Sequence, residues 1–207
     1  MSSRRYSQFC PLAKALDVLG ERWTLLIVRE LLTGPKRYID LRGGLPGMAT
    51  DLLAARLREL QAAGVIERRE VPRPTPATVY ELTERGWALR PAIQELSRWG
   101  RPLLLQPDDD RLPDSALLLG LEVAFRPEAA AGLDETYAVE VDGVRVAVHV
   151  RDGAVEVTPG VAENATVRIT TDRQGFIDLA RGNPGDRVRV EGEPDAIARM
   201  RSVFSLA

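Results

Sequence analysis

One stretch of the chain, residues 48–64 (MATDLLAARLRELQAAG), places side chains suited to nucleic-acid contact on one side of an expected helix. Leu53, Leu57 and Leu60 share a face at four- and seven-residue spacing. The opposite side carries one cation and several small residues: Asp51, Ala54, Ala55, Arg58 and Ala62. Small side chains let a helix approach base edges, and Arg58 can reach phosphate or guanine. The periodicity alone also fits an ordinary amphipathic helix with a solvated face.

The other residue types that could do chemistry are isolated. The single histidine, His149, lies in an alternating apolar stretch without a second metal ligand nearby, so we expect it in a sheet or a core. The sequence shows no paired carboxylates, no nucleophile–histidine arrangement and no metal-ligand spacing. We therefore predict that the protein is not an enzyme and uses no metal or cofactor.

The segments before residues 48–64 read as three helices. Residues 11–19 have helical apolar spacing, and residues 23–32 (WTLLIVRELL) predict a buried second helix. A short helix is expected over 38–42, and glycines and prolines then break the chain before Thr50, the expected N-cap. Helix, short helix, turn and amphipathic helix form the helix-turn-helix pattern.

The segments after residues 48–64 read as a β-hairpin. Residues 65–71 and 79–83 are expected strands, joined by the proline-stiffened turn 72–78 (PRPTPAT). Arg73 at the tip would reach the minor groove or flanking phosphates, and the prolines limit the entropy lost on docking. A plain hairpin is the alternative, but its place directly after the expected recognition helix favours a wing.

A long helix is expected over 84–105, capped by Thr83 and interrupted by Pro91. Its apolar side chains are Trp87, Leu89, Ile93, Leu96 and Trp99. Such a helix exposes more apolar surface than a domain of this size can cover, which favours a second copy of the chain as partner.

The second half predicts an α+β arrangement. A solvated linker, 106–113, precedes an apolar helix over 114–125. Two Asp-Gly pairs separate the first three strands and are strong hairpin signals. The expected strands are 137–141, 144–150, 154–157, 166–171 and 187–191, with helices over 173–180, capped by Asp172, and from Pro194. We therefore predict an antiparallel sheet covered by helices.

Charge is divided unevenly along the 207 residues. Residues 1–101 hold 17 Lys and Arg against 11 Asp and Glu, a net of +6, whereas the remainder holds 11 against 19, a net of −8. This asymmetry favours a polyanion partner for the first half only. A single cysteine, the lack of a signal-like segment and the lack of a long apolar run predict a cytoplasmic protein without a membrane partner.

Motifs in the first half resemble a known family. CPLAKALDVLGERWTLLIVREL (10–31) is similar to the opening of HxlR-type transcriptional regulators, winged-helix relatives of MarR. The similarity continues through 34–69, VYELTERGWAL and LSRWG, and so covers nearly all of 9–100. It implies a homodimer on double-stranded DNA, paired through the N-terminal segment and the long helix after the wing. By position it implies these DNA-facing residues: Thr50, Asp51, Ala54, Ala55, Arg58 and, on the wing, Arg73.

Two positions qualify the resemblance. The family usually has serine near the start of its recognition helix, where this chain reads Met48-Ala49-Thr50, so no operator sequence carries over. Cys10 matches an N-terminal cysteine that some members use as a redox or electrophile sensor and that also occurs as a packed residue. A thiol reacts when its pKa is lowered or when it is exposed, and Lys14, one helical turn along, could stabilise a thiolate.

Residues 115–206 resemble, through looser motifs, the sterol carrier protein type-two family. The similarity rests on the hairpins, on the strand NATVRITT before a capped helix and on the turn VRVEGEP before the terminal helix. It implies an apolar tunnel for fatty acyl or sterol-like ligands, although the same side chains could simply fill a small core. The candidate lining residues are Leu117, Leu118, Leu121, Phe125, Phe176, Ile177, Leu179, Ile197, Met200 and Phe204.

Together these patterns predict a winged helix-turn-helix domain over 1–105, a linker over 106–113 and a smaller α+β domain over 114–207. The predicted function is a homodimeric transcriptional repressor on a palindromic operator, with an apolar small molecule bound by the second domain. The alternative is a hydrophobic-ligand carrier whose first half serves dimerisation.

Overall fold

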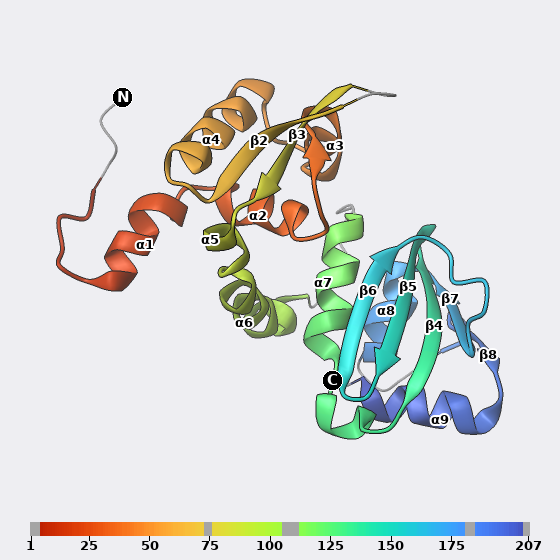
Figure 1. Cartoon of the computed structure of the whole chain (residues 1–207). Helices are drawn as coiled ribbons and strands as arrows, with labels where there is room; N and C mark the ends of the chain where they lie inside the picture. The colour runs from red at the N-terminus through yellow and green to blue at the C-terminus, as the bar shows by residue number, and fades with distance from the viewer. Residues whose placement is uncertain (1–4, 73–75, 105–111, 181–184, 205–207) are drawn as a thin grey trace. The chain divides into compact units, whose positions relative to one another are not determined.

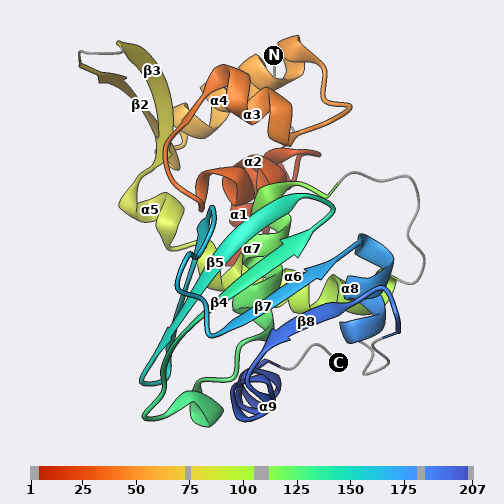
Figure 2. The same cartoon turned by 90° about the vertical axis from the view of Figure 1, so that its right-hand side faces the viewer.

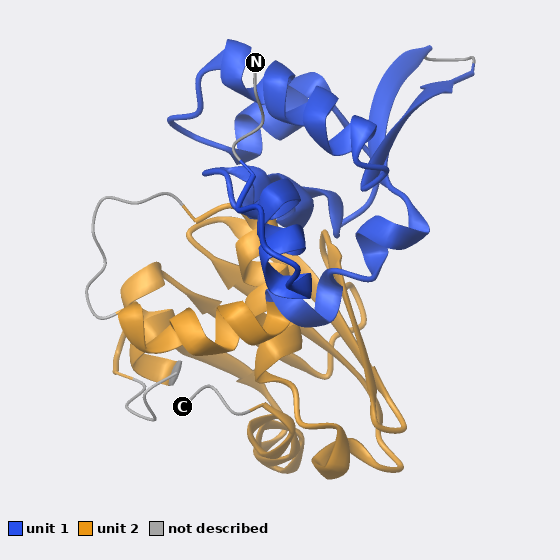
Figure 3. Ribbon diagram, turned by 90° about the vertical axis from the view of Figure 1, so that its left-hand side faces the viewer, with its two compact units in different colours: residues 1–93 blue, residues 94–207 orange. Residues whose placement is uncertain are grey.

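The computed structural model describes residues 5–72, 76–104, 112–180 and 185–204. The chain divides into two compact units, residues 1–93 and 94–207 (Figure 3). Within the described ranges, no helix is both long enough and apolar enough to span a bilayer. Most of the predicted linker and the predicted wing residue Arg73 lie outside those ranges.

The first unit has the element order of a winged helix-turn-helix (Figure 1). Its three strands form a small antiparallel sheet in the order β1-β3-β2. The elements are α1 (Pro11–Leu19), α2 (Thr24–Leu31), β1 (Lys36–Arg37), α3 (Tyr38–Gly44), α4 (Thr50–Ala62), β2 (Ile66–Val71), β3 (Ala77–Leu82) and α5 (Glu84–Trp87). A further helix, α6 (Arg90–Gly100), begins in this unit and ends in the second.

The core of the first unit is built from the apolar faces that the sequence predicts. Leu53, Leu57 and Leu60 of α4 are each 1% exposed, which confirms the leucine face. Val79 and Leu82 of β3 are also buried, as expected for the inward side of the hairpin. Ile27, Val28 and Leu31 of α2 and Leu41 of α3 are buried as well, each at 0% exposure.

Three details of the first unit differ from the predictions. Thr50 is the first residue of α4 rather than its N-cap, which is Ala49. The long helix expected over 84–105 is divided into α5 and α6, because the chain turns at residues 88–89, and Pro91 then lies in the first turn of α6. A proline is tolerated there because its missing N–H has no partner in a first turn. Strand β1 was not predicted, since two residues are too short to show a period.

The second unit is a five-stranded sheet with helices (Figure 2). Its strand order is β6-β5-β4-β7-β8. The elements are the 3₁₀ turn η1 (Arg101–Leu103), α7 (Asp114–Ala124), the 3₁₀ turn η2 (Pro127–Ala130), β4 (Asp134–Val141), β5 (Val144–Arg151), β6 (Ala154–Pro159), β7 (Val167–Thr171), α8 (Arg173–Ala180), β8 (Arg189–Gly192) and α9 (Pro194–Val203).

The prediction of a purely antiparallel sheet is wrong, because β7 pairs with β4 in parallel. The segment between β6 and β7 crosses the sheet instead of making a hairpin. Ala162 of this segment is buried against Ala138 and Ala147, and small side chains at the crossing let it lie flat on the strands. Backbone bonds to Arg145 and Thr136 fix its two ends.

Both predicted hairpin turns are confirmed. The φ angles at Asp142 and Gly143 are 50° and 82°, and those at Asp152 and Gly153 are 44° and 77°. Two successive positive φ values are those of a type I′ turn, whose twist matches that of paired strands.

One face of the second sheet is covered by α7, α8 and α9. Their apolar side chains join those of β4, β5 and β7 in a single core cluster. Tyr137, 1% exposed, lies in this cluster and donates its hydroxyl to Glu135 at 2.7 Å. Burial, then the Glu135 carboxylate, raises the pKa of Tyr137, so this phenol stays neutral and keeps donating.

The start of α8 is fixed by Asp172. Its Oδ1 accepts the backbone N–H of Gly175 at 2.7 Å, and its Oδ2 lies 2.7 Å from Nη1 of Arg187. These bonds, the Gly175 bond first, lower the pKa of Asp172 below its ordinary value. A lowered carboxyl pKa stabilises the fold above the pKa of the unfolded chain, and that contribution disappears as the pH falls through the folded pKa.

We therefore expect Asp172→Ala to lower the melting temperature at pH 7 and to lower it less at about pH 2, because the contribution of the charged carboxyl is lost as the pH falls through its folded pKa. Scanning calorimetry of the full chain at the two pH values measures this. The control, Asp186→Ala, removes an exposed acid from the same region. An equal loss at both pH values would show that the Asp172 charge is not the cause.

Candidate nucleic-acid interface

The helix-turn-helix consists of α3, a tight turn and α4. The Tyr38 hydroxyl donates to the Thr50 backbone oxygen at 2.8 Å and so fastens the start of α4 to the start of α3. Within the turn, Met48 N–H donates to the Leu45 carbonyl, and Gly47 adopts a φ of 81° that favours glycine. The start of α4 is therefore held by backbone geometry and by one tyrosine.

The outer side of α4 carries the predicted DNA-facing residues. Thr50, Asp51 and Arg58 are exposed, and Ala54 and Ala55 are half-buried beside them. Arg58 has no ion-pair partner within the part of the chain that the structure describes. The helix thus brings five of the six predicted residues to one accessible side, with one uncommitted cation.

The wing shaft holds its arginines in ion pairs. Arg69 donates to both carboxylate oxygens of Glu81, from Nε at 2.5 Å and from Nη2 at 2.9 Å. Through these bonds the pKa of Glu81 is lowered and that of Arg69 is raised. Arg68 lies 3.2 Å from Glu70 and 3.3 Å from Thr78. Arg68 and Arg69 of β2 are therefore already paired with carboxylates. Arg58 of α4, which has no such partner among the described residues, is the better candidate for a phosphate contact.

Two exposed arginines that the sequence analysis did not single out flank α3. Arg37 precedes this helix and Arg42 lies in its last turn, and neither side chain has an ion-pair partner among the described residues. Both could have been identified from the sequence, because each is a basic residue at an end of the short helix.

A buried carboxylate lies behind the helix-turn-helix. Glu30 of α2 is 1% exposed and lies 2.8 Å from Nη2 of Arg29 and 2.9 Å from Nζ of Lys36. A Cβ on Gly44, the last residue of α3, would stand 2.4 Å from Glu30 Oε2. The carboxylate therefore joins α2, β1 and the end of α3, and a larger side chain at residue 44 would have to displace it.

Two exposed apolar faces repeat the same spacing. Phe9, Leu12 and Leu16 follow one another at three and four residues along the N-terminal segment, and all are exposed. Leu96, Trp99 and Leu103 of α6 and η1 do the same, with Trp99 74% exposed. Residues three and four apart share one side of a helix, so Leu12 and Leu16 of α1, and Leu96 and Trp99 of α6, each form an apolar strip open to solvent. Phe9, just before α1, and Leu103, in η1, are exposed as well.

Cys10 is half-buried and is the N-cap residue of α1. The ammonium of Lys14 lies 3.6 Å from a carboxylate oxygen of Asp17. Asp17 also accepts the backbone N–H of Tyr6 at 2.9 Å. The redox role of Cys10 stays a prediction, and Lys14 is already engaged elsewhere.

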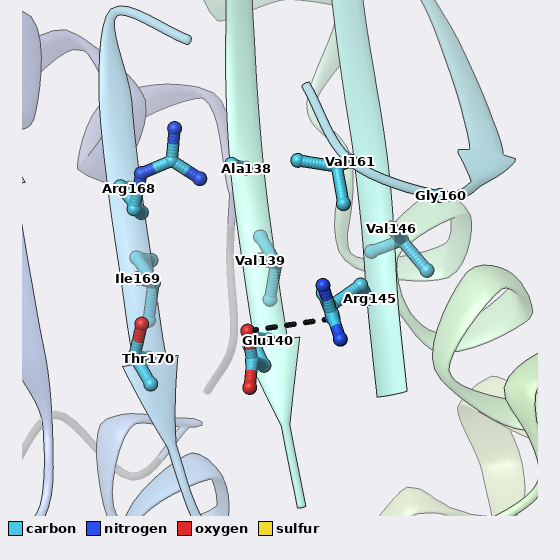
Figure 4. Close-up of a pocket in the computed structure, with 10 residues that line it drawn as sticks. All are labelled: Ala138, Val139, Glu140, Arg145, Val146, Gly160, Val161, Arg168, Ile169 and Thr170. Carbon is cyan, nitrogen blue, oxygen red and sulfur yellow. Dashed lines mark ion pairs between the residues drawn. The ribbon is translucent and has the colours of Figure 1, made fainter. Parts of the chain in front are cut away.

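The predicted ligand-lining residues lie in the second unit's core. Leu117, Leu118, Leu121 and Met200 are buried there, with Phe125, Phe176, Leu179, Ile197 and Phe204 packed against them, whereas Ile177 is half-buried outside that cluster. A shallow pocket beside the crossover segment (Figure 4) is lined by none of these. Ala138, Glu140, Arg145, Arg168 and Thr170 line it instead.

His149 is exposed on the same side of the sheet as that pocket, with Nδ1 3.1 Å from the Thr136 hydroxyl. It is therefore a sheet residue and not a core residue. Among the described residues, no three His, Cys, Asp or Glu side chains lie close enough to hold a metal ion.

Comparisons with known proteins agree with the architecture of the first unit. The model of the HxlR-like helix-turn-helix family matches residues 18–107. The transcriptional regulator YvaP of Bacillus subtilis is 39% identical over 94 residues, which are 45% of this chain and 87% of YvaP. YodB, also from Bacillus subtilis, is 37% identical over 91 residues, 44% of this chain and 81% of YodB.

The solved structure of YodB in its reduced form is 34% identical and covers 49% of this chain and 100% of its own, with a TM-score of 0.42. The family match rests on sequence identity along most of the length of the curated relatives. It agrees with the helix-turn-helix formed by α3 and α4. Through its first half, the chain belongs to the HxlR-like helix-turn-helix family of transcriptional regulators.

Proposed function

We propose that this regulator is a homodimeric repressor that binds a palindromic operator through two copies of α4. The observation that carries the proposal is the accessible side of α4, where small residues flank Arg58, a cation without an ion-pair partner among the described residues. In such a dimer the two helices enter successive major grooves about 34 Å apart. Thr50, Asp51, Ala54 and Ala55 then lie against the groove, and Arg73 on the wing reaches flanking DNA.

The homodimer is supported by the apolar strips of α1 and α6. Exposed Phe9, Leu12 and Leu16, and exposed Leu96 and Trp99, are costly to leave in water, at about 25 cal/mol per Å² of apolar surface. A second copy of the chain would cover them. Sedimentation equilibrium is expected to give twice the chain mass, and Trp99→Glu is expected to shift the mass toward one chain. A wild-type protein of single-chain mass at micromolar concentration would refute the dimer.

Arg58 is expected to contact a base or a phosphate, so Arg58→Ala should weaken operator binding by about 1–3 kcal/mol. Fluorescence anisotropy with labelled operator DNA measures the change. The control, Arg201→Ala, removes one exposed positive charge from α9 without touching the first unit. If the two variants lost affinity equally, net charge and not contact would explain the effect.

We further propose that the region 114–207 binds an apolar small molecule that controls the dimer. The support is the extensive apolar core beneath the sheet and the loose resemblance of this region to sterol carrier domains. A ligand regulates only if it prefers one arrangement of the two recognition helices, since equal affinity for both shifts nothing. Thermal shifts with fatty acyl and aromatic compounds test this, and the absence of any shift across such a series would remove the ligand from the account.

A further inference from the structure

The bend between α1 and α2, residues 20–23, which we call the elbow, contacts the recognition helix through an ion pair. Oε2 of Glu21 lies 2.8 Å from Nη2 of Arg56, a residue in the middle of α4. The same guanidinium pairs through Nη1 with Glu59, one turn further along α4. The Arg56 side chain is only 15% exposed, and its Nε is buried without a hydrogen-bond partner among the described residues.

The elbow also approaches the turn that precedes α4. Trp23 adopts a φ of 77°, an outlier for a bulky residue that persists where the surroundings hold it. Its ring edge lies 3.9 Å from where a Cβ on Gly47 would stand, and the Arg22 guanidinium lies over the ring at 5.4 Å. One bend of the chain is therefore in reach of both the turn and the middle of the recognition helix.

We propose that the elbow fixes the position of α4, with Arg56 as a positioning residue and Arg58 as the DNA contact. The inference rests on the proposed DNA-binding function. Arg56 and Arg58 are two positions apart on one helix, so their side chains point to different sides and can have different roles. Arg56 is held between two carboxylates and is largely covered, whereas Arg58 is exposed and uncommitted among the described residues. A guanidinium engaged in this way is not available to phosphate.

Glu21→Gln gives a test whose sign separates the two explanations. Glu21 is an exposed acid, with 56% of its side chain accessible. If it merely repels DNA, its neutralisation should tighten binding. If it positions α4 through Arg56, the same substitution should weaken operator binding by about threefold or more. Glu84→Gln, which neutralises an exposed acid at the start of α5, is the matched control and should bind as tightly as wild type or tighter.

A double-mutant cycle on the full chain then assigns the effect to the pair. Arg56→Met keeps the alkyl stem and removes the charge. Because Glu21 and Arg56 act together, the double variant should lose no more affinity than the larger of the two single losses. Glu21→Gln combined with Arg58→Met should instead lose the product of its two single effects. The slope of log affinity against log salt should fall by about 2 for Arg58→Met, about 1 for each copy in the dimer, and stay unchanged for Arg56→Met.

Several results would overturn the inference. Tighter operator binding by Glu21→Gln, independent losses for Glu21 and Arg56, or a reduced salt slope for Arg56→Met would each remove the positioning role. Because Glu21 is exposed, its glutamine variant keeps the test valid even if Arg56→Met fails to fold. If wild type and all variants fail to bind DNA, the proposed function fails, and that outcome differs from binding without coupling.

Discussion

Glu30→Ala is expected to lower the free energy of unfolding of the first unit by about 3–5 kcal/mol, because it removes a buried carboxylate and leaves two half-buried cations without this partner. Glu30 is 1% exposed, and Lys36 and Arg29 both lie within 2.9 Å of its carboxylate. Its loss also leaves a void against Gly44 at the end of α3. The substitution therefore loosens the helix-turn-helix from behind.

Urea unfolding followed by tryptophan fluorescence measures this effect. Trp23 and Trp87 lie in the first unit and Trp99 lies in the part of α6 that belongs to the second, so the transition that Trp23 and Trp87 report is the one to compare. Glu30→Gln, which keeps the shape and two polar atoms, is expected to lose less. A loss below about 1 kcal/mol for Glu30→Ala would contradict this prediction. It would mean that the ion pairs of Glu30 stabilise the fold no more than exposed salt bridges do.

Operator affinity is expected to fall by about 10³–10⁵ between 50 mM and 200 mM salt, if the dimer makes roughly 6–10 phosphate contacts. Each contact releases counterions from DNA, so the affinity depends on salt with a slope set by the number of cations engaged. Arg37, Arg42 and Arg58 supply exposed cations in each copy. The whole chain carries a net charge of −2, so the effect must come from this local set.

Anisotropy titrations at five or more salt concentrations give the slope. Arg42→Ala, which removes one exposed cation of α3, should lower the slope and weaken binding to all sequences alike. An affinity independent of salt would mean that phosphate contacts contribute little and would contradict the proposed docking of α4.

The sequence predicted those features that depend on neighbours along the chain. The leucine face of α4, the two Asp-Gly turns and the Asp172 cap follow from spacing and from residue types that suit one local geometry. The position of β7 in the sheet could not be predicted from such local patterns. Its pairing with β4 depends on a crossing segment that packs on Ala138 and Ala147, and strand periodicity carries no signal for that choice.

In the candidate site, too, local features could be predicted and long-range contacts could not. Helical spacing predicted that Arg58 is accessible, and the structure confirms its exposure. Spacing could not predict that Arg56 is held by Glu21, because these residues are 35 positions apart and only the folded elbow brings them together. The ion pairs of the wing arginines were hidden for a similar reason, since they depend on hairpin register.

One measurement tests the central claim most directly: binding of the full chain to DNA from upstream of its own gene, in a gel shift with excess unrelated DNA as competitor. We expect a retarded complex that survives the competitor and weakens with Arg58→Ala. A complex abolished equally by unrelated DNA, or no complex at all at low salt, would contradict a sequence-reading role for α4 and favour the hydrophobic-ligand carrier.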